Sequence, residues 1–230
     1  MKRTSYARRI EPLIGTLNEG SLHVALKDWY AKPGDEFEVP LDGFVIDIRR
    51  GDELIEIQTS GFAQMSRKLD HLLDHYEILL VHPIAVETWL HKPDAKPRRS
   101  PRKGTVFSVF DELVSVPTLL DHPRLTLDVV LVSVDKIQVA DPKARRGRGG
   151  FRTVDRRLRE VIRSHRFATV DDLIGLIPPG LPKEFTTADL ASVAGVSRET
   201  ARKMAYCFRP LGVFDETRRT RAGYHYRLTV

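Results

Sequence analysis

Two carboxylates in a short hairpin sequence are the residues of this chain best suited to chemistry. Residues 44–58 form two alternating, β-branched arms around Gly51-Asp52, a pattern typical of a two-residue hairpin turn. Pairing about this turn places Asp47 opposite Glu56, with Cβ atoms roughly 4.5–5.5 Å apart. Like charges in that position are destabilising unless a cation lies between them, and a divalent metal with oxygen ligands is the simplest such cation. The hairpin therefore predicts a metal site.

The same register predicts that the hairpin has one apolar and one polar face. Asp47, Glu56 and Gln58 share the polar face. The alternative interpretation of this face is an ordinary solvent-exposed surface of an antiparallel sheet. The residues expected on the apolar face are Phe44, Ile46, Ile48, Ile55 and Ile57.

The surrounding periodicity predicts the elements that position the hairpin. Apolar spacing predicts helices over residues 14–30, 66–76 and 107–120, the last ending near Pro117. Short strands are expected at 36–40 and 77–83, and one or two strands at 125–139. The order is helix, three strands, helix, strand, which indicates an α/β fold.

This order, with Asp47 and the triplet Glu56-Ile57-Gln58, resembles the core of the PD-(D/E)XK nuclease superfamily over about residues 12–84. That superfamily carries an acid on the first helix, an Asp on the second strand and Glu-x-Lys on the third. The resemblance implies a restriction-endonuclease-like α/β fold, a mixed sheet flanked by helices, and hydrolysis of phosphodiester bonds with Mg²⁺ or Mn²⁺. It also implies that Asp47, Glu56, the Ile57 carbonyl and Glu19 bind the metal.

Gln58 departs from the superfamily pattern because it stands in the lysine position. Its amide can orient a water molecule but has no charge. Lys27, Arg67 and Lys68 are candidates, by position, to supply that charge. The alternative is a catalytically inactive nuclease fold in a DNA-binding transcriptional regulator. The catalytic set implied by the resemblance is Asp47, Glu56, Gln58 and Glu19.

Composition indicates a nucleic-acid partner. The chain has 230 residues and a net charge of +6. Residues 1–140 carry 18 Lys/Arg and 21 Asp/Glu (−3), whereas residues 141–230 carry 19 and 10 (+9). Such asymmetry is typical of polyanion binding. A single cysteine excludes an internal disulfide framework, and no apolar run resembles a signal peptide or membrane span, so we expect a cytoplasmic protein without membrane association.

The change in charge coincides with a Gly/Arg-rich segment. Residues 141–152 predict a basic linker between a nuclease-like domain, 1–140, and a smaller domain, 153–230. Helices are expected at 154–164 and 169–177. A second basic segment, 92–103, contains three prolines and is expected to lack regular structure.

The smaller domain contains a helix-turn-helix pattern. Thr186 and Asp189 are spaced as a capping box, Gly195 permits a tight turn and Ser197 can cap a second helix. Residues 190–200 resemble the helix-turn-helix consensus of bacterial DNA-binding proteins.

Two predicted strands, 212–216 and 224–228, flank a basic tip and complete a winged version of that motif. Winged helices also serve as protein-interaction modules, but the basic tip favours nucleic acid, and we expect duplex DNA as partner, with a homodimer left open. The residues implied in DNA binding are Arg198, Thr200, Arg202 and Lys203 on the second helix, and Arg218, Arg219 and Arg221 at the tip.

Overall fold

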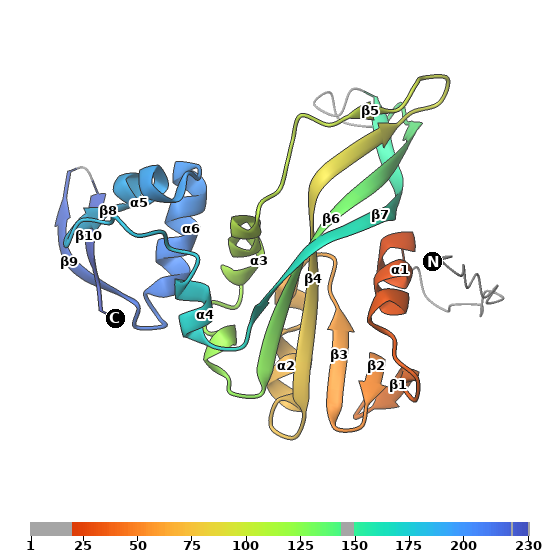
Figure 1. Cartoon of the computed structure of the whole chain (residues 1–230), viewed down its shortest axis with the longest axis horizontal. Coiled ribbons are helices and arrows are strands. Elements are labelled where there is room, and N and C mark those ends of the chain that lie inside the picture. Colours follow the sequence, from red (N-terminus) through yellow and green to blue (C-terminus); the bar gives the residue numbers. More distant parts are fainter. Residues whose placement is uncertain (1–19, 144–149, 222, 230) are drawn as a thin grey trace, which may run out of the picture.

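The computed structural model describes residues 20–143, 150–221 and 223–229. The fold is mixed α/β, with a seven-stranded mixed sheet and a small three-stranded antiparallel sheet near the C-terminus (Figure 1). This confirms the predicted α/β class. The elements of the first part are α1 (Ser21–Tyr30), β1 (Glu36–Leu41), β2 (Phe44–Arg50), β3 (Glu53–Ile57), α2 (Ser66–Leu72), β4 (Glu77–His91), β5 (Arg98–Arg99), α3 (Phe110–Leu113), β6 (Leu125–Ala140) and β7 (Phe151–Phe167), with short 3₁₀ turns at Phe62–Gln64, Val106–Val109 and Leu119–Asp121.

The large sheet has the strand order β1-β2-β3-β4-β6-β7, with the two-residue β5 paired to β4. The pairs β3–β4 and β4–β6 are parallel, and the other pairs are antiparallel. The helix α2 makes the crossover between the parallel strands β3 and β4. The short pairing of β5 is a small correction to segment 92–103, which was expected to have no regular structure.

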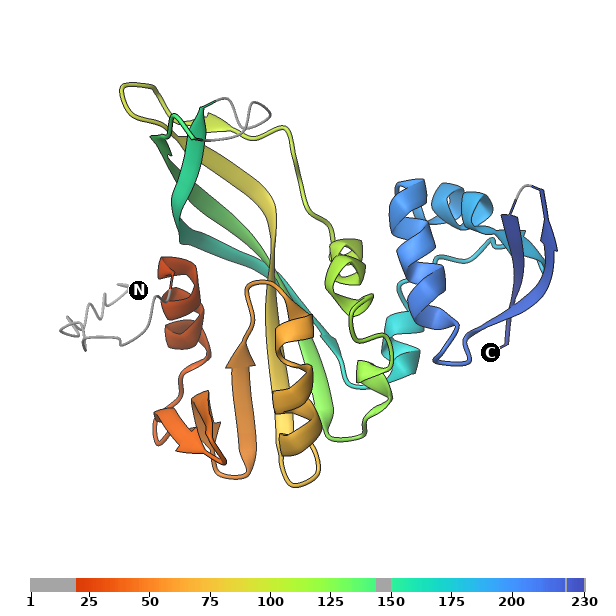
Figure 2. The same ribbon diagram turned by 180° about the vertical axis from the view of Figure 1, so that it is seen from behind.

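Helices α1 and α2 cover opposite faces of this sheet (Figures 1 and 2). Leu22 and Leu26 of α1 pack in one apolar cluster, and Leu69 and Leu72 of α2 pack in a second, larger one. Because both faces are covered, the prediction of one apolar and one polar hairpin face is wrong. Ile48, Ile55 and Ile57 lie in the α1 cluster, whereas Ile46 and Phe44 pack on the α2 side.

Three strands form a long twisted arm. The strands β4, β6 and β7 contain 15, 16 and 17 residues and continue past the ends of β1–β3 (Figures 1 and 2). The helix predicted at 154–164 is wrong, since these residues belong to β7. Register shifts in the β6–β7 ladder break the period of two and leave Val154, Leu158 and Val161 at spacings that imitate a helix.

The predicted linker therefore has a different place in the fold. Residues 141–150 connect β6 to β7 within one sheet, and residues 144–149 lie outside the described part of the chain. The large sheet ends at Phe167, so the start of the C-terminal unit lies after that residue rather than at 153.

The C-terminal unit follows the sequence pattern closely. Thr186 and Asp189 form the capping box, Ser197 caps the second helix, and Gly195 joins the two helices with φ +63°. The Phe208 ring contacts Phe110 of α3 at a centroid distance of 5.5 Å, so this unit shares a core with the first part. Its elements are α4 (Val170–Ile174), β8 (Phe185–Thr186), α5 (Thr187–Ala194), α6 (Arg198–Phe208), β9 (Phe214–Thr220) and β10 (Gly223–Leu228).

No helix among the described residues has both the length and the apolar character needed to cross a membrane.

Candidate functional site

At the turn, β2 and β3 pair in the predicted register. The backbone pairing ends before the two carboxylates. Arg50 pairs with Glu53 and Ile48 with Ile55, around a two-residue turn in which Gly51 has φ +59°. Beyond this point the Asp47 carboxylate takes the place of the ladder, since its Oδ2 accepts the Ile57 N–H at 2.7 Å. The N–H and C=O of an antiparallel strand residue point to the same neighbouring strand, so the Ile57 carbonyl faces the same opening.

Basic side chains of α1 surround Asp47. The His23 ring Nε2 lies 3.1 Å from Asp47 Oδ2, and the Lys27 ammonium lies 3.8 Å from Oδ1. Lys27 also pairs with Glu38 of β1. Burial opposes ionisation of Asp47, but the His23 hydrogen bond, the Ile57 N–H and the Lys27 charge outweigh it and lower the pKa of this carboxyl. Asp47 is therefore ionised at neutral pH.

Glu56 has the opposite electrostatic balance. Its side chain is 7% exposed, and Lys68 of α2 lies 2.5 Å from Oε1 while also donating to the Val45 carbonyl at 2.6 Å. Burial raises the pKa of Glu56 to about 7, and the nearby Asp47 charge adds to this although Lys68 counteracts it. The two carboxylates of the site therefore have pKa values shifted in opposite directions.

The donor set fits a magnesium ion. Asp47 and Glu56 are buried carboxylates on neighbouring strands, and Ile57 lies against the Asp47 carboxylate, so the site offers the oxygen ligands that Mg²⁺ takes together with water. Across the described ranges, no group of three or more His, Cys, Asp or Glu side chains could hold a metal, so any further ligands must come from elsewhere. Glu19, the fourth predicted ligand, lies outside the described residues.

Gln58 is turned into the loop that follows β3. Its side-chain amide donates to the carbonyls of Ser60 and Gly61, the latter at 3.2 Å. Its own carbonyl lies 2.8 Å from His82 Nδ1, because Pro83 has no N–H to continue the ladder. Gln58 lines an open pocket together with Glu56 and Lys68. The charge beside Glu56 therefore comes from Lys68, one of the three basic candidates.

Sequence reasoning missed several groups around the site. His23 was not among the predicted site residues, although it is four positions before Lys27 on α1, a spacing that places both on one helix face. Glu112 of α3 accepts the N–H groups of Gly61 and Phe62 at 2.9 and 3.2 Å and so fixes the turn after Gln58. No local signal could identify Glu112, which lies about 50 residues from its partners.

The predicted DNA-binding residues of α6 divide into two groups. Arg198 and Arg202 are exposed. Lys203 instead pairs with Asp111 of α3 and with Glu199, both at 2.9 Å. Thr200 takes part in the helix cap through Ser197.

The predicted tip residues lie on or beside the β9–β10 hairpin. Arg218 pairs with Glu184 at 2.8 Å, and the Arg219 guanidinium lies 5.1 Å from the centre of the Tyr224 ring. Arg221 is exposed at the tip. The tip therefore remains basic, although one of its three arginines is neutralised within the protein.

Comparison with known proteins places this mixed α/β chain in one family. A family model described as a domain of unknown function (DUF8091) matches residues 20–168, and the chain belongs to that family. The match ends beside the last residue of β7. An uncharacterized protein of Treponema pallidum (strain Nichols) is 33% identical over 184 residues, covering 77% of this chain and 73% of the relative. No solved structure matches the chain.

Proposed function

We propose that this protein is a metal-dependent DNA endonuclease with a restriction-endonuclease-like N-terminal part and a winged-helix C-terminal unit. The observation that carries the proposal is the pair Asp47 and Glu56, both buried where β2 and β3 separate. Burying two carboxylates side by side costs free energy unless they bind a cation or perform chemistry. A purely structural role gives no reason for placing both at the end of a ladder.

The residues of the site divide the work of phosphodiester hydrolysis. Asp47, Glu56 and the Ile57 carbonyl would hold Mg²⁺ or Mn²⁺, which supplies an activated water and neutralises charge on the phosphate. His23 and Lys27 keep Asp47 ionised and oriented. Lys68 replaces the charge that Gln58 lacks, from a position on α2 instead of β3.

The C-terminal elements support a DNA-binding role. The order α4-β8-α5-α6-β9-β10 and the sheet order β8-β10-β9 correspond to a winged helix. Arg198, Arg202 and Tyr206 follow one another at four-residue spacing along α6, and Tyr206 is 55% exposed. This stripe is suited to enter a DNA groove, with the β9–β10 tip contacting phosphate.

The test is cleavage of plasmid and linear duplex DNA by the purified full chain. We expect cleavage with Mg²⁺ or Mn²⁺, none with excess chelator, and a loss of at least about 10³-fold in Asp47→Asn and Glu56→Gln. Asp52→Asn, at the exposed hairpin turn, is the matched control and should cleave like the wild type. Activity of both site variants at the wild-type rate contradicts the proposal.

The second candidate is a non-enzymatic DNA-binding regulator. It is favoured by the ion pairs that Lys27 and Lys68 make with the two carboxylates, which already balance part of their charge. In that case the wild type binds DNA but leaves it intact with every divalent metal, and Asp47→Asn does not change DNA binding.

A further inference from the structure

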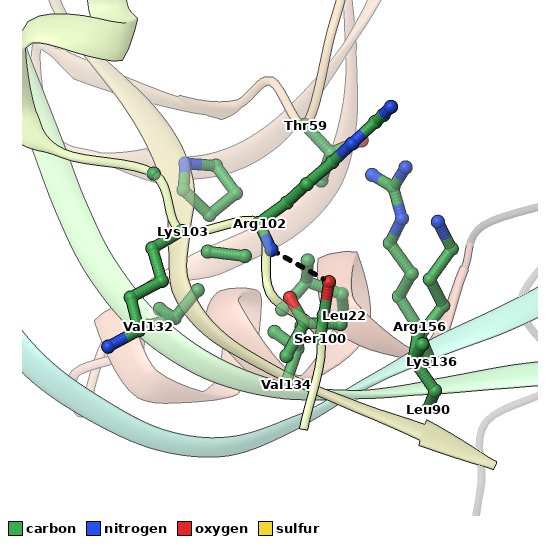
Figure 3. A pocket seen from close by; sticks show the side chains of 14 residues that line it. Leu22, Thr59, Leu90, Ser100, Arg102, Lys103, Val132, Val134, Lys136 and Arg156 are labelled. Carbon is green, nitrogen blue, oxygen red and sulfur yellow. Dashed lines mark hydrogen bonds between the residues drawn. The ribbon is translucent and has the colours of Figure 1, made fainter. Parts of the chain in front are cut away.

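A basic pocket lies between the arm and α1, apart from the carboxylate pair. It encloses about 300 Å³ and is formed by β4, β6, β7, the segment 100–104 and the start of α1. Its floor is apolar, with Leu22, Val132 and Val134 (Figure 3). The lining contains no carboxylate and has four basic side chains, Arg102, Lys103, Lys136 and Arg156.

The wall that carries Arg102 is held in place by the backbone. Ser100 N–H donates to the Thr88 carbonyl at 2.8 Å, and Gly104 N–H donates to the Ala85 carbonyl at 2.9 Å. A Cβ atom at Gly104 would lie 2.5 Å from a methyl group of Ile84 and 2.9 Å from the Ala85 oxygen, so the segment sits directly against β4. The pocket is thus built by a fixed segment and not by a loose loop.

The basic groups of the pocket gather at one side. Lys136 and Arg156 are direct partners across the β6–β7 ladder. Arg102 extends towards the same side, near Thr59, whereas Lys103 points away (Figure 3). Several other arginines of β7 pair with carboxylates, as Arg157 does with Asp155.

Within the described ranges, Arg102 and Arg156 make no ion pair with a carboxylate, in contrast to Arg159 and Arg166, which pair with Asp135 and Asp128. A pocket that collects positive charge and excludes carboxylates is suited to an anion. Guanidinium groups bind phosphate through two parallel hydrogen bonds, which makes phosphate the favoured ligand.

The pocket adjoins the candidate active site. Thr59 lines it and directly follows Gln58. A neighbouring depression shares Leu22, Thr59 and Arg156 with it and adds His23, the residue that hydrogen-bonds Asp47. The depression therefore extends from the basic pocket to His23 beside Asp47, and its lining also includes Asp155, which accepts a hydrogen bond from Ser21.

We propose that the pocket binds backbone phosphates of the DNA strand that leads into the site at Asp47 and Glu56. This inference rests on the proposed function. Arg102 and Arg156 contact the phosphate oxygens, and the apolar floor accepts the sugar faces. The pocket would fix the position of the strand through phosphate contacts, which carry no sequence information.

The experiment measures DNA binding by the full chain without cleavage. Fluorescence anisotropy with a labelled duplex and a labelled single strand, in chelator or Ca²⁺, compares the wild type with Arg102→Gln/Arg156→Gln. We expect the double variant to bind about tenfold more weakly and to have a log–log salt slope smaller by about 1.5–2 on duplex DNA. Its melting temperature should stay close to that of the wild type, because both arginines are exposed.

A matched control removes the same charge elsewhere. Lys32→Gln/Arg163→Gln replaces two exposed basic residues outside the pocket and should bind DNA within about twofold of the wild type. Equal loss in both double variants, or no loss in the pocket variant, overturns the proposal, as does a wild type that binds no DNA.

Inorganic phosphate and a mononucleotide separate the two sources of the phosphate group. If millimolar phosphate raises the melting temperature of the wild type but not of the pocket variant, while both bind DNA equally, the pocket serves a free anion and the DNA proposal fails. A wild type that binds DNA through the pocket but never cleaves it refutes the nuclease proposal alone. Cleavage that persists in the pocket variant with unchanged DNA binding refutes the pocket alone.

Discussion

The carboxylate site and the C-terminal unit use charge in different ways. At Asp47 and Glu56 the charges are buried, and each carboxylate contacts basic groups from a helix that covers the sheet. In the C-terminal unit the charges are exposed, and Lys203 and Arg218 are partly neutralised by acids nearby in space. A buried charge without function is a cost, whereas an exposed ion pair contributes little in either direction. The first region therefore gives the stronger indication of function.

Among the variants that test this comparison, replacing Lys68 should change the cleavage rate most. We expect Lys68→Met to lower the cleavage rate about 10²-fold with DNA binding nearly unchanged, because its ammonium group acts beside Glu56 at the reacting phosphate. Gln58→Ala should lower the rate less, since its amide is occupied by Ser60 and Gly61. Single-turnover cleavage and anisotropy measure the two quantities.

Arg67 is the matched comparison, because it is an exposed basic residue that lines the same pocket as Lys68, whereas Lys68 is the one that pairs with Glu56. Arg67→Met should keep cleavage within a few-fold of the wild type. If Gln58→Ala lowers the cleavage rate more than Lys68→Met does, Gln58 orients the attacking water. Lys68 would then act only as a counterion to Glu56.

Features formed by residues close together in the sequence were predicted, whereas features that depend on distant segments were not. The turn at Gly51-Asp52 and the pairing from Arg50–Glu53 to Ile48–Ile55 are local, so alternation and turn chemistry predicted them. The cap residues of α5 and α6 were predicted for the same reason. The strand β7 was predicted as a helix because its register shifts disturb the alternation, and only its partner β6 shows the pairing.

Contacts between distant segments could not be predicted from the sequence. Glu112 and the Gly61 N–H are 51 positions apart, and Lys203 and Asp111 are 92 apart. Such pairs depend on how α3 packs between the large sheet and α6, which no local pattern specifies. The prediction of one apolar and one polar hairpin face was wrong for a similar reason. Helices α1 and α2 cover both faces of the sheet, and this packing decides which hairpin residues are buried.

The pH dependence of stability separates the two carboxylates. The pKa of Glu56 is raised to about 7 from an ordinary value of 4.5, so the folded protein keeps a proton that the unfolded chain releases. Its contribution to stability is complete below about pH 4.5 and is lost as the pH rises through 7. The pKa of Asp47 is lowered, so its contribution is present above its ordinary value of 3.8 and changes little between pH 5 and 8.

We therefore expect the melting temperature of the metal-free protein to fall between pH 5 and 8, and Glu56→Gln to reduce that fall. Asp52→Asn serves as the control and should follow the wild type. Addition of Mg²⁺ at pH 8 should raise the melting temperature of the wild type but not of Glu56→Gln. If Glu56→Gln and the wild type show the same pH dependence, the pKa of Glu56 is not raised and the electrostatic part of the site argument fails.

The smallest expected effect distinguishes neighbouring residues of α6. Arg202 is exposed, whereas Lys203 is held by Asp111 and Glu199. Arg202→Gln should reduce the log–log salt slope of DNA binding by about 0.9, the value for one duplex phosphate contact. Lys203→Gln should leave that slope nearly unchanged and lower the free energy of unfolding by at most about 1 kcal/mol, because its ion pairs are partly exposed. Anisotropy across a salt series and urea unfolding of both variants provide the measurements.

If Lys203→Gln reduces the slope as much as Arg202→Gln, Lys203 must leave Asp111 when DNA binds. The α3–α6 contact would then differ between the free and bound states, and since Glu112 on the same helix holds the turn after Gln58, DNA binding at α6 would be coupled to the carboxylate site.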